Sequence, residues 1–214
     1  MPAEAVELHT YDSERLEAQW DVPDDPLMAV VFCHPHPQQG GAMTAPLMRG
    51  VTKHLTLADV AVLRFNFRGV GESSGDWGGG VGEIHDVRAA VDHADERSLP
   101  LAIAGWSFGA AASLRWQAVS RSALPWVGIA PPVPPAYTLD MPGGSDLVPA
   151  SRTIIMGDRD QLIDPEDSRR YADSIGASFH LMAGSDHFFS FREERVAGLM
   201  LEALGLPVQS PEPE

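Results

Sequence analysis

The chain has 214 residues, of which 44% are hydrophobic and 21% charged, an ordinary composition for a globular protein. Acidic residues outnumber basic ones by 30 to 15, and the net charge of −15 disfavours binding to nucleic acid or to an anionic membrane surface. The single cysteine, Cys33, excludes an intramolecular disulfide, and no apolar run reaches the roughly 20 residues of a membrane-spanning helix. The first residues carry no export signal, so a cytoplasmic location is the default expectation.

The chain begins with two short segments that are typical of a β-hairpin. Residues 5–10 and 15–20 are separated by Tyr11-Asp12-Ser13-Glu14, and we expect this hairpin to add to the antiparallel edge of a larger sheet. Six later apolar runs are short and continuous, as in strands that are buried on both faces. They span residues 28–33, 60–66, 100–104, 125–130, 152–156 and 177–182.

Helical patterns lie between these runs, at about residues 44–58, 83–97, 108–121, 165–174 and 190–204. Strands that alternate with helices predict an α/β fold, with a mostly parallel sheet of about eight strands and helices on both faces. We expect one domain over residues 1–206 and a flexible tail over residues 207–214. Residues 75–82 and 131–150 are predicted loops, and the longer of them is too short to form a cap domain.

A candidate nucleophile follows the predicted strand 100–104. Residues 105–109 read Gly-Trp-Ser-Phe-Gly and lead into a helix of small residues. Gly105 and Gly109 let strand and helix approach each other around a tight turn at Ser107, the setting in which Gly-x-Ser-x-Gly exposes a reactive serine. The helix start presents backbone N–H groups, and the N–H of Phe108 is the candidate for binding a developing oxyanion.

A serine hydroxyl needs a base to accept its proton, and an acid to orient that base. The candidate base is His187, in the loop Gly-Ser-Asp-His-Phe-Phe after the last predicted strand. The turn after strand 152–156 offers three acids, Asp158, Asp160 and Asp164. The residues by themselves leave the choice among these three open.

The chain order serine, acid, histidine is the order found in α/β-hydrolases, and the chain resembles that family over nearly its whole length. The segments GWSFG, GDRDQLID and GSDHFF are similar to the family's nucleophile elbow, acid turn and histidine loop. The resemblance implies Ser107 as nucleophile, His187 as base and Asp160 as acid, because the family's acid stands three residues after the glycine, here Gly157. It implies no organic or metal cofactor.

The remaining acids then have expected structural roles. Asp158 and Asp164 suit turn formation or helix capping. Asp186 is adjacent to His187 in sequence, and such neighbours rarely point at one another, so we expect it to shape the loop.

The segment HPHPQQGG, residues 34–41, follows the strand 28–33. In α/β-hydrolases the equivalent strand ends in His-Gly, and the next residue gives the second oxyanion N–H. Here Pro35 replaces the glycine, which implies the N–H of His36 as that donor, since Pro37 has none. For His34 we expect a role in packing or hydrogen bonding behind the site. With NFRGVGES at residues 66–73, the segment resembles a small, capless bacterial group of predicted α/β-hydrolases.

Zinc binding is the competing interpretation of His34 and His36, but it needs a third ligand that no other histidine supplies at a suitable spacing. We therefore predict no metal site. On the helix 83–97, the residues His85, Asp86, Asp92 and His93 are typical of a solvated face.

Trp106, Trp77 and Gln38 are the candidates for binding substrate, although the tryptophans also suit core packing. Arg68 is expected to brace its turn; it could instead border the pocket or brace the oxyanion loop through backbone carbonyls. The favoured prediction is a serine esterase or thioesterase that acts on a small acyl substrate through an acyl-enzyme. An acyltransferase, a peptidase of the prolyl-oligopeptidase type and a non-catalytic binding protein are the alternatives, and the oligomeric state stays open.

Overall fold

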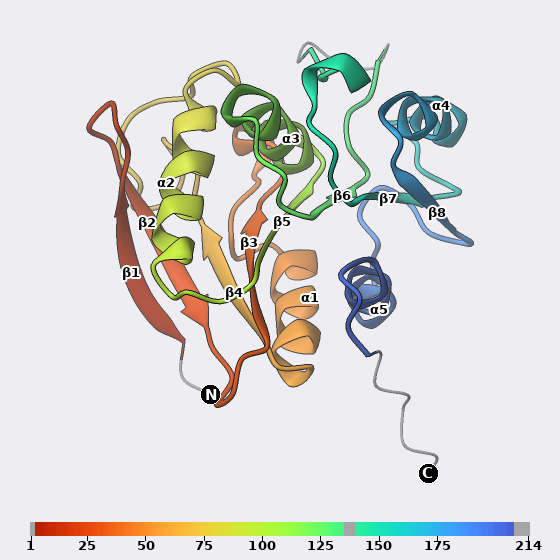
Figure 1. Cartoon of the computed structure of the whole chain (residues 1–214). Coiled ribbons are helices and arrows are strands. Elements are labelled where there is room, and N and C mark those ends of the chain that lie inside the picture. The colour runs from red at the N-terminus through yellow and green to blue at the C-terminus, as the bar shows by residue number, and fades with distance from the viewer. Residues whose placement is uncertain (1–2, 135–139, 208–214) are drawn as a thin grey trace.

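The computed structural model describes residues 3–134 and 140–207, and within them a single eight-stranded sheet has the order β1-β2-β4-β3-β5-β6-β7-β8 (Figure 1). The predicted tail falls almost entirely outside the described residues. The strands are β1 (Glu4–His9), β2 (Arg15–Asp21), β3 (Met28–Cys33), β4 (Val60–Phe65), β5 (Leu101–Trp106), β6 (Trp126–Ile129), β7 (Arg152–Gly157) and β8 (Ser178–Met182).

The sheet is parallel except at one edge, as predicted. β1 pairs with β2, and β2 with β4, in antiparallel register, so the N-terminal hairpin does extend the sheet at its antiparallel edge. The strands from β3 to β8 pair in parallel. Because all these parallel strands point the same way, the loops after β3, β5, β7 and β8 leave from one edge of the sheet, where sites in open α/β sheets form.

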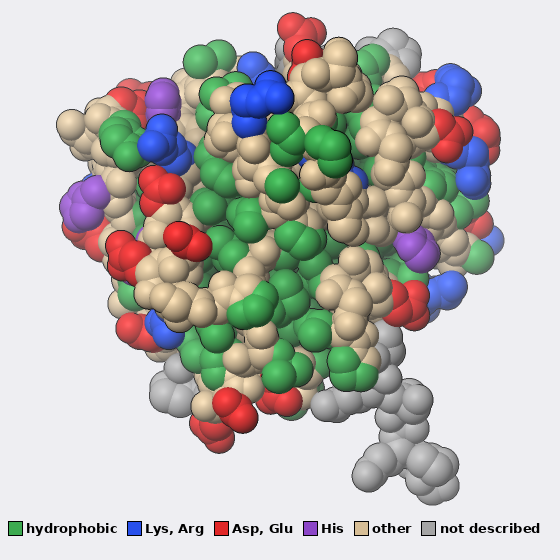
Figure 2. Space-filling model, viewed as in Figure 1, with side chains coloured by type: hydrophobic (Ala, Val, Ile, Leu, Met, Phe, Trp, Pro, Cys, Tyr) green, Lys and Arg blue, Asp and Glu red, His purple; other side chains and the backbone are tan. Residues whose placement is uncertain are grey.

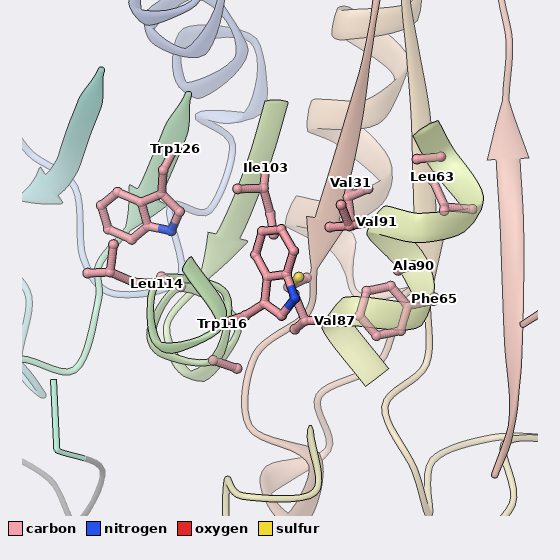
Figure 3. Packing of buried hydrophobic residues seen from close by; sticks show 14 of the residues in the cluster. Val31, Leu63, Phe65, Val87, Ala90, Val91, Ile103, Leu114, Trp116 and Trp126 are labelled. Carbon is pink, nitrogen blue, oxygen red and sulfur yellow. The ribbon is translucent and has the colours of Figure 1, made fainter. Parts of the chain in front are cut away.

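The helices cover the sheet on both faces (Figure 1). They are α1 (Pro46–Leu57), α2 (Glu83–Asp95), α3 (Phe108–Ser120), α4 (Pro165–Ile175) and α5 (Glu193–Ala203). Buried side chains of α1 and α5 form one hydrophobic cluster with the sheet, and those of α2, α3 and α4 form a second. In the second cluster, Trp116 and Trp126 pack with residues of the central strands such as Ile103 and Val31 (Figure 3).

The strand β5 extends two residues further than predicted, and this extension positions the turn after it. Trp106 is paired with Ile129 of β6, and the N–H of Ser107 donates to the Ile129 carbonyl at 2.8 Å. The pairing with β6 therefore continues up to the candidate nucleophile. Local pattern could not indicate this, because Gly105 and Trp106 read as part of the turn.

The surface carries charge of both signs. Figure 2 shows hydrophobic side chains in the middle of one face, with most acidic and basic side chains toward its margins. Within residues 3–134 and 140–207, none of the helices combines the length and the apolar composition that crossing a membrane requires. In the same ranges, no separate lid is inserted between the core strands.

Candidate active site

Ser107 lies in the sharp turn between β5 and α3 and has an unusual backbone conformation, with φ 51° and ψ −118°. A non-glycine residue adopts a positive φ only where its surroundings enforce it. The two flanking glycines permit this turn. A Cβ at Gly105 would lie 2.3 Å from the backbone nitrogen of Ala110, and a Cβ at Gly109 would lie 2.3 Å from the carbonyl oxygen of Cys33. The elbow therefore packs directly against the end of β3.

The structure brings Ser107, His187 and Asp160 together from the ends of β5, β8 and β7. The Nε2 atom of His187 lies 3.1 Å from Oγ of Ser107, and its Nδ1 atom lies 2.7 Å from Oδ2 of Asp160. Only 5% of the His187 side chain is exposed, and none of the Asp160 side chain. A hydroxyl, an imidazole and a buried carboxylate in this order can activate the hydroxyl as a nucleophile.

Asp160 is held by its own turn. Its second carboxylate oxygen, Oδ1, accepts hydrogen bonds from the N–H groups of Leu162 and Ile163, at 2.8 and 2.9 Å. These bonds leave Oδ2 directed at the imidazole. Gly157 allows the acid turn to approach the histidine loop, because a Cβ there would lie 2.3 Å from the carbonyl oxygen of Ser185.

The other three acids have the structural roles that the sequence suggested. Asp158 accepts from the N–H of Gly184 at 2.7 Å, which ties the acid turn to the histidine loop. Asp164 is the N-cap of α4 and accepts from the N–H of Glu166 at 2.8 Å. Asp186 closes its own loop, because its carboxylate accepts hydrogen bonds from the N–H groups of Phe188 and Phe189, at 3.0 Å each. Among these acids, Asp160 is the one that contacts His187.

His34 and His36 do not converge on a common point. His36 is the N-cap of a short 3-10 helix, and its ring lies between Trp77 and Phe108, with centroids 4.7 and 5.3 Å away. His34 is fully buried and both its ring nitrogens contact backbone groups. Burial lowers the pKa of His34 to about 4, so the ring is neutral near pH 7. In the described part of the chain, no three His, Cys, Asp or Glu side chains are grouped so that they could hold a metal ion.

A cavity of about 310 Å³ opens beside Ser107 and His187. It is lined by Pro35, His36, Gln39, Gly40, Gly41, Ala45, Pro46, Trp77, Gly79, Trp106, Ser107, Phe108, Pro132, Leu162, His187 and Phe188. None of these described lining residues carries a permanent charge. The predicted pocket residues Trp77 and Trp106 are among them, but Gln38 is not, because the short 3-10 helix turns the neighbouring Gln39 toward the cavity instead.

Sequence reasoning missed several apolar lining residues, among them Leu162, Phe188 and Pro132. The sequence could have indicated two of them as pocket residues, since Leu162 follows the acid turn and Phe188 follows His187 directly. Trp106 also has a second role. Its indole N–H donates to the carbonyl of His187 at 3.1 Å, and this bond joins the elbow to the histidine loop.

The prediction that Asp86 lies on a solvated face of α2 is wrong, because this residue is completely buried. The reason is Arg68, whose guanidinium nitrogens lie 2.7 Å from Asp86 on one side and 2.7 Å from Asp12 on the other. Arg68 thus braces its turn as expected, but through two carboxylates and not through backbone carbonyls, and it does not line the cavity. His85, one residue before Asp86, is exposed as predicted.

Glu83, in the first turn of α2, is a second buried acid that the sequence did not single out. It accepts hydrogen bonds from the N–H groups of Gly78 and Gly80, at 2.7 and 2.8 Å. These bonds fix the glycine-rich loop that carries Trp77. Glu83 therefore connects this loop, which forms part of the cavity wall, to α2.

Comparison with known proteins gives consistent matches. The chain matches the family model of the alpha/beta hydrolase domain over residues 28–203. An uncharacterized protein of Rickettsia prowazekii is 31% identical over 185 residues, which are 80% of this chain and 75% of that protein.

Two solved structures are also similar. The structure of an α/β serine hydrolase without a lid from Xanthomonas campestris has a TM-score of 0.83 at 27% identity, covering 98% of this chain and 99% of that chain. An alpha-beta serine hydrolase homologue from Coxiella burnetii has a TM-score of 0.81 at 28% identity, covering 95% and 98%. From the family match, and from a mostly parallel, eight-stranded sheet without a separate lid in the described residues, we conclude that the chain belongs to the alpha/beta hydrolase family.

Proposed function

We propose that this protein is a serine hydrolase that cleaves an ester or thioester of a small acyl group through an acyl-enzyme. One observation carries the proposal: Ser107, His187 and Asp160 form a continuous hydrogen-bonded chain at the wall of an apolar cavity. The similarity to proteins described as serine hydrolases supports it. The absence of a separate lid in the described residues fits a substrate that enters an open site.

The proposed reaction has two halves. Ser107 Oγ attacks the substrate carbonyl while His187 Nε2 takes the hydroxyl proton, and Asp160 stabilises the imidazolium that forms. The tetrahedral oxyanion is bound by the N–H of Phe108, which as the first residue of α3 has no intrahelical acceptor, and by the N–H of His36. The intermediate collapses as His187 protonates the leaving alcohol or thiol. Water activated by His187 then hydrolyses the acyl-enzyme and regenerates the serine.

The lining of the cavity suggests the kind of acyl group. A space of about 310 Å³ without a charged described lining residue favours an uncharged, largely apolar acyl group over an amino-acyl or phosphorylated one. Aromatic rings make up much of its wall, contributed by Trp77, Trp106, Phe108 and Phe188. Fit to this wall is expected to set the preferred chain length.

Labelling with a fluorophosphonate probe tests the proposed nucleophile. The expected result is one modified peptide, with the probe on Ser107, and loss of labelling after prior incubation with a short-chain p-nitrophenyl ester. Labelling of a different serine would overturn the assignment. No labelling of the folded protein would favour a non-catalytic binding protein on the same fold.

Trp77→Ala is expected to change the acyl-length preference. The indole packs against Phe108 with ring centroids 5.0 Å apart, and its removal enlarges the cavity next to Ser107. The ratio of kcat/KM for p-nitrophenyl octanoate to that for the acetate should rise about tenfold, since one methylene in a hydrophobic pocket is worth about 1–3 kcal/mol. Trp77→Phe keeps an aromatic wall and should shift the ratio less. An unchanged ratio in both variants would show that Trp77 does not contact the acyl chain.

A further inference from the structure

His34 lies fully buried beneath the candidate oxyanion loop, and its hydrogen bonds define its tautomer. The N–H of Phe67 points at Nε2 of His34, with the two nitrogens 3.0 Å apart. A backbone N–H can only donate, so Nε2 must accept and cannot carry a proton. In the neutral ring the proton therefore sits on Nδ1. That nitrogen lies 2.6 Å from the carbonyl oxygen of Pro35, so it donates to this carbonyl.

This bond determines where the next N–H points. The Pro35 carbonyl and the His36 N–H belong to the same planar peptide, and in a trans peptide they point in opposite directions. When the carbonyl is held toward the buried imidazole, the N–H is turned away from the protein interior. Pro35 and His36 both line the cavity that holds Ser107. Among the described residues, the His36 N–H has no hydrogen-bond acceptor, so it is free for a substrate oxygen.

The surroundings leave this peptide little freedom. The carbonyl of His36 accepts from the N–H groups of Gln39 and Gly41, at 3.0 Å each. Gly41 packs so closely that a Cβ there would lie 2.2 Å from the Pro35 carbonyl oxygen. The ring of His34 is itself fixed by edge-on contact with Phe67, with centroids 4.8 Å apart. The peptide is thus held from both sides by groups that are themselves buried or hydrogen-bonded.

We infer that His34 is a positioning residue, whose Nδ1–H holds the Pro35–His36 peptide so that the His36 N–H faces the oxyanion formed at Ser107. The inference rests on the proposed function, because it assigns a role in stabilising that oxyanion. It also explains how a loop with proline in place of the family's glycine supplies the donor. The imidazole of His34 touches no substrate; it acts through the peptide that it holds.

Two isosteric variants separate this role from simple packing. In His34→Asn, the amide nitrogen occupies nearly the place of Nδ1 and can still donate to Pro35, while the bond to Phe67 is lost. In His34→Gln, the amide oxygen reaches nearly the place of Nε2 and can still accept from Phe67, while the bond to Pro35 is lost. Each variant removes one hydrogen bond and some buried volume. Similar losses of thermal stability are therefore expected from the two.

The two variants should differ in catalysis. His34→Gln is expected to lower kcat for p-nitrophenyl butyrate by about 10- to 100-fold, somewhat less than complete loss of one oxyanion donor, with KM within about threefold. Its affinity for an alkyl boronic acid, which forms a tetrahedral serine adduct, should fall by a similar factor. His34→Asn is expected to recover most of both losses. Equal kcat in the two variants, whether reduced or unchanged, would overturn the inference.

A third variant displaces the same carbonyl and does not alter His34. Gly41 has no positive φ, so alanine fits its backbone, but the added Cβ must displace the Pro35 carbonyl. Gly41→Ala is expected to lower kcat and boronate affinity together, as His34→Gln does. Should His34→Gln fail to fold, unchanged boronate affinity in Gly41→Ala would still overturn the inference. Failure of the proposed function is distinguishable, because it appears in the wild-type protein as missing fluorophosphonate labelling at Ser107.

Discussion

Replacement of Ser107 by alanine is expected to lower kcat for hydrolysis of p-nitrophenyl esters by about 10⁴- to 10⁶-fold, because no other group in the site can form the acyl-enzyme. The cavity is lined mainly by other residues, so KM should change little. Steady-state rates with p-nitrophenyl acetate and butyrate measure both effects. Ser120→Ala is the matched control, since this serine lies at the far end of the same helix and its hydroxyl donates to the Trp116 carbonyl.

Asp160→Asn extends this test to the rest of the hydrogen-bonded chain. The amide can still contact His187, but it cannot stabilise the imidazolium, and kcat should fall by about 10⁴-fold. Because the three residues act as a unit, the double variant with Ser107→Ala should be no slower than Ser107→Ala alone. If Ser107→Ala kept wild-type kcat, the assigned nucleophile would be wrong. Loss of activity in Ser120→Ala would point to helix damage instead.

The parts of the site that could be predicted from sequence depend on local geometry. Gly105 and Gly109 flank Ser107 at the spacing that a strand–turn–helix connection needs, and the structure shows why, since a Cβ at either position would meet backbone atoms. The three-residue spacing from Gly157 to Asp160 is equally local. Such features reside in a few consecutive residues, so they can be recognised without knowledge of the tertiary structure.

The parts that could not be predicted depend on contacts between distant segments. Asp86 looks like a surface residue on an amphipathic helix, and only the position of Arg68, 18 residues earlier, shows that it is buried. For His34 the sequence predicted only packing or hydrogen bonding behind the site, because its partner Phe67 lies 33 residues away and could not be identified. Gln38 and Gln39 are indistinguishable by type, and the 3-10 helix alone decides which of them faces the cavity.

Arg68 is expected to be the residue outside the site whose loss costs the most stability. Its guanidinium makes hydrogen bonds of 2.7 and 3.0 Å to Asp86 and of 2.7 and 3.1 Å to Asp12. Burial raises the pKa of Asp86, and Arg68 opposes that rise. The hydrogen bonds from Arg68 hold the pKa of the more exposed Asp12 well below its usual value. The arginine therefore stabilises two carboxylates, one of which has no access to water.

Arg68→Met should lower the free energy of unfolding by about 3–5 kcal/mol at pH 7, because it leaves the Asp86 carboxylate buried without its counter-charge. Urea denaturation measures the change. Asp86→Asn in the Arg68→Met background removes the buried charge and keeps an oxygen that can accept from the backbone N–H of residue 68, so it should recover much of the loss. Arg88→Met breaks an exposed pair with Asp92 on the same helix and should cost about 1 kcal/mol or less.

The dependence of this loss on pH identifies its cause. In Arg68→Met the guanidinium no longer opposes the effect of burial, so the pKa of Asp86 in the folded state lies further above its unfolded value than in the wild type. The folded state then binds a proton more tightly than the unfolded chain, and the stability of the variant falls as pH rises through this range. The deficit relative to wild type should thus be smaller at about pH 5 than at about pH 7.5. A deficit that is the same at both pH values, or one that Asp86→Asn leaves unchanged, would mean that lost packing of the arginine side chain, and not an unpaired buried charge, destabilises the fold.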